Sequence, residues 1–217
     1  MYTEILKYTS DHHVTLVAVS KTKPAEDIML LYRNGQRIFG ENKVQEMVGK
    51  YELLPKDIQW HLIGHLQSNK VKYIAPFISM IHSVDSEDLL KVIHKEAKKY
   101  KRVIPILLQF HIATEETKFG LDVSEACQLL DNVKKNPLDG VKICGVMGMA
   151  SFTEVKQQVL NEFKTLKKIF TMLKDSYFPD DESFREISMG MSGDYMTAIE
   201  EGSTMVRIGS AIFGSRI

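Results

Sequence analysis

The amino-acid sequence predicts a (β/α)8 barrel, the TIM-barrel fold, and three observations support this fold class. Eight short apolar segments alternate with helix-like segments over 217 residues. No repeat, low-complexity linker or change of composition divides the chain. No Gly-x-Gly-x-x-Gly motif follows the first strand, which argues against the alternative, a doubly wound open sheet that normally has fewer strands. We therefore expect one barrel domain that spans residues 1–217.

The first predicted strand, residues 14–19, is apolar and rich in β-branched side chains, as expected for a strand buried on both faces. Polar residues begin at its carboxyl end with Ser20 and Lys21, so a lysine is placed at the mouth of the core. Seven further strands are predicted at residues 37–40, 58–63, 79–84, 102–109, 141–147, 184–188 and 205–208.

Helices are predicted between these strands from capping signals and apolar periodicity. Pro24, followed by Glu26 and Asp27, is typical of a first helical turn. Residues 85–88 and 121–125 supply capping side chains for two later helices. The predicted helices cover residues 24–35, a segment that opens at 41, a segment that ends at 75, and residues 85–100, 121–136, 153–175 and 193–201.

Composition favours a small ligand over a polymer. The 28 basic and 28 acidic residues balance, so no overall field attracts nucleic acid or an anionic membrane. No apolar run is long enough to cross a bilayer and the first residues do not resemble a signal peptide, so we expect a cytoplasmic protein. The balanced charge and the absence of an evident apolar surface stripe favour a monomer. Cys127 and Cys144 are interpreted as two buried thiols.

The segments after the last two strands resemble a phosphate-binding cup. Ser192 is placed to cap the helix after the seventh strand, whose free N–H groups would attract an anion. Gly209 allows close backbone approach after the eighth strand, and the hydroxyl of Ser210 can donate a hydrogen bond. The alternative is that these are ordinary tight turns, in which glycine and serine are common.

Lys21 would lie across the barrel mouth from this cup. A lysine amine beside apolar walls can attack an aldehyde and form a Schiff base. The cofactor that joins an aldehyde to a phosphate is pyridoxal 5′-phosphate (PLP). Lys23 is the alternative amine in this loop. His61 and His65 are four residues apart but lack the glutamate of a zinc protease, so we interpret them as packed or hydrogen-bonding residues.

These residues belong to a series of motifs that resembles the YggS/PROSC family of pyridoxal phosphate homeostasis proteins, which share the barrel of the alanine racemase N-terminal domain. The motifs run in order through nearly the whole chain. They are AVSKTKP (18–24), FGENKVQE (39–46), WHLIGHLQSNK (60–70), HSVD (82–85), KFG (118–120), GVMGM (145–149), SMGMS (188–192) and GSTMVRIGSAIFG (202–214).

The resemblance implies a role for seven residues. It implies that Lys21 holds PLP as an internal aldimine and that a cation faces the pyridine nitrogen, which weakens the ring as an electron sink. The residues implied are Lys21 for the covalent link, Ser192, Gly209 and Ser210 for the phosphate, Arg207 for the ring nitrogen, and Asn42 and Met147 for the pocket lining.

Three departures from the family pattern stand out. Only residues 1–13 precede the first strand, so we expect most of the leading helix of relatives to be missing and the bottom of the barrel to be less covered. Leu62 stands where an aromatic residue or methionine is usual, a core exchange that should be tolerated. His111 replaces a common asparagine near the barrel mouth, which leaves its effect on cofactor access open.

The sequence therefore favours a non-catalytic PLP-binding protein that buffers the cofactor or delivers it to PLP-dependent apo-enzymes, with no nucleic-acid or membrane partner. The alternative is a PLP-dependent amino-acid racemase. Racemization needs a second acid/base, which in alanine racemase is a tyrosine of a partner's extra β-domain, and we expect none here because the chain ends at Ile217. A cofactor-free barrel enzyme acting on a sugar phosphate would fit the cup but leaves the sequence around Lys21 unexplained.

Overall fold

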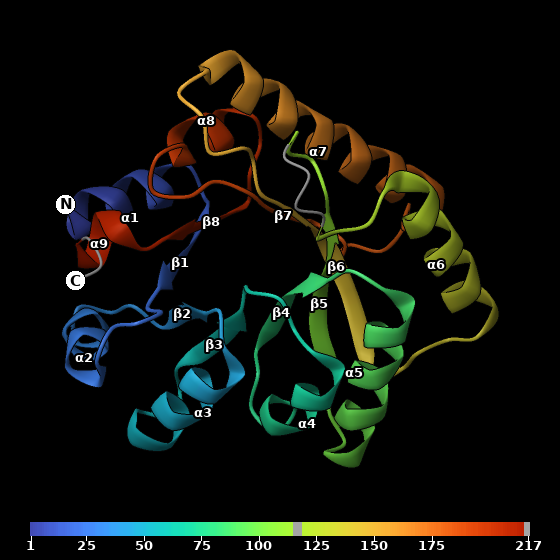
Figure 1. Ribbon diagram of the computed structural model, residues 1–217, viewed down its shortest axis with the longest axis horizontal. Helices are drawn as coiled ribbons and strands as arrows, with labels where there is room; N and C mark the ends of the chain where they lie inside the picture. The colour runs from blue at the N-terminus through green and yellow to red at the C-terminus, as the bar shows by residue number, and fades with distance from the viewer. Residues whose placement is uncertain (115–118, 215–217) are drawn as a thin grey trace.

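The computed structural model describes residues 1–114 and 119–214, and in this part of the chain eight parallel strands form a closed barrel (Figure 1). Each strand pairs with its neighbours in sequence, and β1 closes the ring by pairing with β8. The strands are β1 (Thr15–Val19), β2 (Ile38–Glu41), β3 (Gln59–Leu62), β4 (Met80–Val84), β5 (Ile104–Phe110), β6 (Val141–Gly148), β7 (Glu186–Ser188) and β8 (Met205–Ile208). The predicted fold class is confirmed.

Helices cover the outside of the barrel, as Figure 1 shows. Ser86 is the N-cap of one helix, and Asp122 and Glu125 form a capping box on the next, as their sequence signals predicted. The helical segments are α1 (Tyr2–Asp11), α2 (Ala25–Arg33), α3 (Val44–Leu53), η1 (Ser68–Lys70), α4 (Val71–Ile74), α5 (Glu87–Lys99), α6 (Val123–Lys135), α7 (Lys156–Tyr177), α8 (Tyr195–Glu200) and α9 (Ser210–Phe213).

The main apolar core lies between the strands and the helices. Phe39, Trp60 and Ile81 on β2, β3 and β4 are fully buried, together with Ile28 of α2 and Ile93 of α5. Because side chains alternate along a strand, the residues between them point into the barrel. The β4 residue His82 confirms this direction, since its side chain crosses the interior to reach β7 on another part of the ring.

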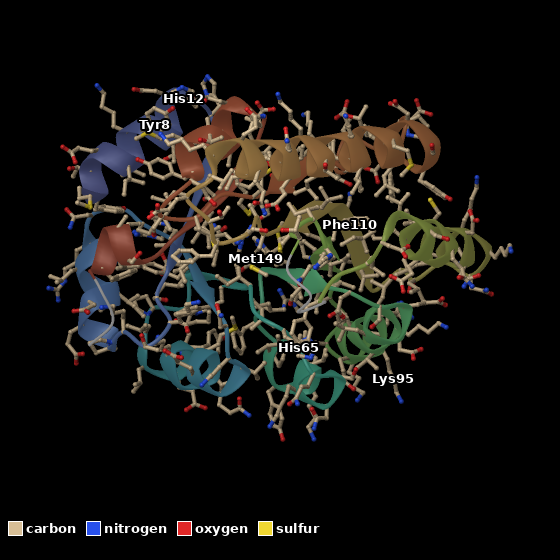
Figure 2. The ribbon with its side chains drawn as sticks, turned by 45° about the horizontal axis from the view of Figure 1, so that its top comes forward. Tyr8, His12, His65, Lys95, Phe110 and Met149 are labelled. Atoms are coloured by element: carbon tan, nitrogen blue, oxygen red, sulfur yellow. The ribbon has the colours of Figure 1, made fainter. Side chains whose placement is uncertain are left out.

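The amino-terminal segment forms a ten-residue helix, α1, which the sequence analysis did not predict. Ile5 packs in a second apolar cluster with Leu16 of β1 and Ile208 of β8. Tyr8 contacts the ring of His12 with 4.3 Å between ring centroids (Figure 2), and it meets the ring of Tyr195 edge to face with 5.9 Å between centroids. Helix α1 therefore covers the β8–β1 side of the barrel, and the expected poorer cover of the barrel bottom stays a prediction.

Smaller differences concern the carboxyl-terminal half. The helix predicted from residue 153 begins at Lys156, and the strand predicted over 184–188 begins at Glu186 because Phe184 packs in the core from the preceding turn. A short helix, α9, follows β8 and was not predicted. Cys144 is buried, but Cys127 is only partly so, which corrects the prediction of two buried thiols. No helix among the described residues is long and apolar enough to cross a membrane.

Candidate functional site

All seven predicted site residues lie toward the carboxyl ends of five consecutive strands of the ring, β6, β7, β8, β1 and β2. In a parallel barrel these ends share one face, where loops assemble binding sites. Met147 lies on β6, Ser192 in the loop after β7, Arg207 on β8, Gly209 and Ser210 at the turn into α9, Lys21 just after β1, and Asn42 just after β2. The fold therefore places the predicted residues on neighbouring elements.

The structure distinguishes the two lysines of the loop after β1. The Lys23 amine donates a hydrogen bond to the Phe213 carbonyl at the end of α9, with 3.0 Å between nitrogen and oxygen. Lys23 thus fastens this loop to the segment that follows β8. Lys21 is half-buried and lies two residues after the end of β1, at the carboxyl end of the barrel.

Ser192 lies against the start of α9 instead of capping α8. Its Oγ accepts hydrogen bonds from the backbone N–H groups of Gly209 and Ala211, each at 3.3 Å. The predicted cap of α8 is wrong because that helix begins later, with Asp194 as its N-cap residue. The Asp194 carboxylate accepts from the Met191 N–H at 2.5 Å and closes the intervening turn. Ser192 therefore lies in the predicted cup, beside the backbone N–H groups at the start of α9.

Gly209 lets the end of β8 approach the end of β1. A Cβ atom at this position would lie 3.2 Å from the Val19 carbonyl oxygen and 3.3 Å from the Val19 Cβ. Ser210, the next residue, is exposed and begins α9. The cup of Ser192, Gly209 and Ser210 therefore borders the strand that leads directly to Lys21.

Arg207 is a buried cation on β8, with 3% of its surface exposed. It donates to the Ser188 Oγ from Nη1 at 2.6 Å and to the Gly148 carbonyl from Nη2 at 3.1 Å. Burial lowers the pKa of the Arg207 guanidinium to about 10, so the group remains charged at neutral pH. Two hydrogen bonds, donated to Ser188 of β7 and to Gly148 of β6, therefore hold the planar guanidinium in one orientation.

Ser188 connects this cation to two histidines across the barrel interior. The Ser188 Oγ lies 3.0 Å from His82 Nδ1, and His82 Nε2 lies 2.9 Å from His61 Nδ1. Arginine can only donate, and His82 Nδ1 is the acceptor that the described residues offer to the Ser188 hydroxyl. We therefore assign a chain of hydrogen bonds in which Arg207 donates to Ser188, Ser188 donates to His82, and His82 donates to His61.

Both histidines are held neutral. Burial lowers the pKa of His61 to about 3, and burial, the neighbouring His61 and the Arg207 charge lower the pKa of His82 well below its ordinary value. His61 is thus a hydrogen-bonding residue, as predicted, and the described residues contain no group that could hold a metal ion. His65 instead lies 3.5 Å from Asp85 and contacts the Phe119 ring, near the middle of Figure 2.

Sequence reasoning gave no role to Ser188 or His82, although both stood in quoted motifs. The available signal was a polar side chain inside an apolar strand, as in Met80–Val84, where an inward-pointing polar group needs an internal partner. The partner of His82 is Ser188, which is 106 residues away in sequence. Local patterns contain no information on such a pairing.

The remaining predicted positions line the same face. Met147 is fully buried beside Leu107 and Cys144 in the barrel interior. Asn42 is packed so closely against the loop after β3 that a Cβ on Gly64 would lie 2.6 Å from the Asn42 carbonyl oxygen.

The departures from the family pattern have mixed outcomes. Leu62 is fully buried, which confirms that the exchange falls in the core, and its tolerance stays a prediction. His111 follows β5 and is half-buried, with its backbone N–H bonded to the Leu121 carbonyl. Lys118, the first residue of the KFG motif, lies outside the described residues.

The family model of the alanine racemase N-terminal domain matches residues 3–217. A pyridoxal phosphate homeostasis protein of Aquifex aeolicus is 39% identical over 202 residues, 93% of this chain and 86% of that protein. A human protein of the same name is 38% identical over 213 residues, 93% of this chain and 76% of that protein.

Solved structures agree with the sequence relatives. PipY of Synechococcus elongatus, determined with PLP bound, is 34% identical with a TM-score of 0.84, and 93% of each chain is covered. Alanine racemase of Bartonella henselae is 18% identical with a TM-score of 0.67, covering 97% of this chain and 57% of that enzyme, and shows likeness of fold alone. The chain, with its closed barrel and with all the predicted site residues on one face, belongs to the family of pyridoxal phosphate homeostasis proteins.

Proposed function

We propose that this protein binds PLP through Lys21 and acts in PLP homeostasis as a non-catalytic carrier. The observation that carries the proposal is that three kinds of group lie at the ends of consecutive strands of the ring, β7, β8 and β1. These groups are the cup after β7 and β8, the buried Arg207 cation on β8, and the Lys21 amine after β1. PLP has an aldehyde, a phosphate and a pyridine ring, and each matches one of these groups. PLP is bound in a solved relative, PipY.

Each residue of the proposed site has a defined task. The Lys21 amine would bind the aldehyde carbon, with loss of one water molecule, to give a Schiff base. Ser192, Gly209 and Ser210 would bind the phosphate through hydroxyl and N–H donors. Arg207 would face the ring nitrogen, and its fixed charge would disfavour protonation of that nitrogen.

Two residues complete the proposed pocket. Asn42 and Met147 would line it on either side, the first from the end of β2 and the second from β6. The buried Met147 supplies an apolar wall. A pocket of this kind binds PLP but suppresses its electron-sink chemistry, which suits storage or delivery to apo-enzymes. We further propose that residues 1–217 act as one domain, as a monomer and in the cytoplasm.

The first test is covalent mapping of the cofactor. The purified protein is mixed with PLP, its visible absorption is recorded, and the linkage is reduced with borohydride and located by peptide mass mapping. We expect an adduct on Lys21 that is lost in Lys21→Met and kept in Lys23→Met, the matched control. An adduct on Lys23, or one spread over surface lysines, would contradict the proposed site.

The second test separates a carrier from a catalyst. The PLP-loaded protein is incubated with D- or L-alanine, and in parallel with the apo-form of a PLP-dependent enzyme. We expect no interconversion of the alanines and recovery of the apo-enzyme's activity. Robust racemization would replace the carrier by the racemase alternative.

A further inference from the structure

Lys50 on α3 is the centre of a hydrogen-bond network that lies outside the site described above. It contacts Ser20 before Lys21 directly, and it is connected to Thr22 after Lys21 through Glu46. The Lys50 Nζ donates to the Ser20 carbonyl at 2.8 Å and to Oε1 of Glu41 and of Glu46, each at 2.7 Å. An ammonium group has three N–H donors, so this one is fully used. The Lys50 and Glu41 side chains are 9% and 0% exposed. Such an arrangement requires all its members, since a lone buried charge is very unfavourable.

Each glutamate also binds one of the two residues that flank Lys21. The Ser20 Oγ donates to Glu41 Oε1 at 2.6 Å, and the Thr22 N–H donates to Glu46 Oε1 at 2.5 Å. The residue before Lys21 and the residue after it are thus both connected to the same buried ammonium group.

Thr22 is the strained residue of this loop. Its φ is +66°, in the left-handed region that β-branched residues rarely occupy. Such a conformation persists only where surrounding contacts hold it. The hydrogen bond from the Thr22 N–H to Glu46 is a contact of this kind. The left-handed residue comes directly after Lys21, so it determines the direction in which the chain leaves that residue.

We propose that Lys50, Glu41 and Glu46 form an ionic clamp that fixes the Ser20–Thr22 segment and so positions the Lys21 amine. The proposal rests on the proposed function, since it takes Lys21 as the PLP-binding residue. The three clamp residues are positioning residues: they contact the backbone and side chains beside Lys21, and they lie on β2 and α3. Without the clamp, only a fraction of molecules would present Lys21 correctly, and the apparent affinity would fall by that fraction.

The test removes the clamp at Glu46 and restores the backbone by a different route. Glu46→Ala deletes the acceptor of the Thr22 N–H, and the side chain is partly exposed, so the fold is expected to survive. Relaxation of a left-handed L-residue corresponds to about 1.4 kcal/mol, so we expect PLP affinity to fall about tenfold. Glycine adopts positive φ without strain, so Thr22→Gly in the same chain should restore most of the affinity. Glu52→Ala, on the exposed side of α3, is the matched control and should bind like the wild type.

A second measurement needs no cofactor. Amide hydrogen exchange of the peptide covering residues 14–25 should be faster in Glu46→Ala than in Glu52→Ala, with no change elsewhere in the barrel. The clamp is refuted if Glu46→Ala matches Glu52→Ala in both measurements, or if Thr22→Gly does not restore the affinity. If the wild type fails to bind PLP, the proposed function fails, and the exchange measurement alone decides whether the clamp holds this segment.

Discussion

Removal of the Ser188 hydroxyl is the sharpest test of the buried chain inside the barrel. Ser188→Ala deletes the oxygen that lies 2.6 Å from Arg207 Nη1 and 3.0 Å from His82 Nδ1. A hydrogen bond to a charged group contributes roughly 1.5–3 kcal/mol, and an unsatisfied buried acceptor costs roughly 1–3 kcal/mol. Arg207 keeps its bond to the Gly148 carbonyl, so we expect the low end of the summed range, a loss of about 2.5 kcal/mol in the free energy of unfolding.

Urea unfolding without added PLP measures this loss. The midpoint should fall while the slope of the free energy against urea stays unchanged, because the surface exposed on unfolding is the same. Ser124→Ala on the exposed surface of α6 is the matched control and should change the free energy of unfolding by less than about 0.5 kcal/mol. A loss below about 1 kcal/mol in Ser188→Ala would refute the reasoning, since it would mean that the hydroxyl satisfies neither neighbour in the native protein.

Three further predictions follow from the same structure. The pKa of His61 is lowered to about 3 and that of His82 is also lowered, whereas the unfolded chain protonates both near pH 6.5. The free energy of unfolding should therefore be highest above that pH and decrease below it, by up to roughly 1.4 kcal/mol per pH unit for each histidine. Urea unfolding between about pH 7.5 and about pH 5.5 measures this decrease, and a free energy that stays constant over that range would contradict it. Gly209→Ala should weaken PLP binding by about tenfold in an absorption titration, because its methyl group would press on the end of β1 at 3.2 Å; wild-type affinity would show that the turn can yield. Cys127 should react with a thiol reagent before Cys144, whose pKa is raised by burial; equal rates in the native protein would contradict this order.

The fold could be predicted because parallel strands and capped helices leave local signals. Residues 14–19 read as a doubly buried strand, and the structure places β1 at Thr15–Val19. The capping box at Asp122 was likewise visible in sequence. Helix α1 was not predicted because its start carries no capping signal: its N-cap residue is Met1, which makes no side-chain hydrogen bond. Its buried Ile5 and Thr9 pack against the barrel, and such tertiary packing supplies most of the stability of a short helix.

Only those features of the candidate site that depend on local sequence could be predicted. Glycine and serine after the last strands indicated the cup, yet the partner of Ser192 turned out to be the start of α9 and not α8. The reason is a side-chain bond within the preceding turn, from Met191 to Asp194, that delays α8. The Lys50 clamp was not predicted either, since it depends on β2 and α3 meeting beneath the loop after β1.

The charge states around Arg207 favour a holding site over a catalytic one. Acid–base catalysis at a PLP ring needs groups that gain and lose protons near neutral pH. Arg207 stays protonated because its pKa, although lowered, is about 10, and His61 stays neutral because burial lowers its pKa to about 3. His82, between them in the chain, is pushed in the same direction as His61. The hydrogen-bonded chain that orients the cation is therefore locked in one protonation state, so these three side chains would not exchange protons with a bound cofactor near neutral pH.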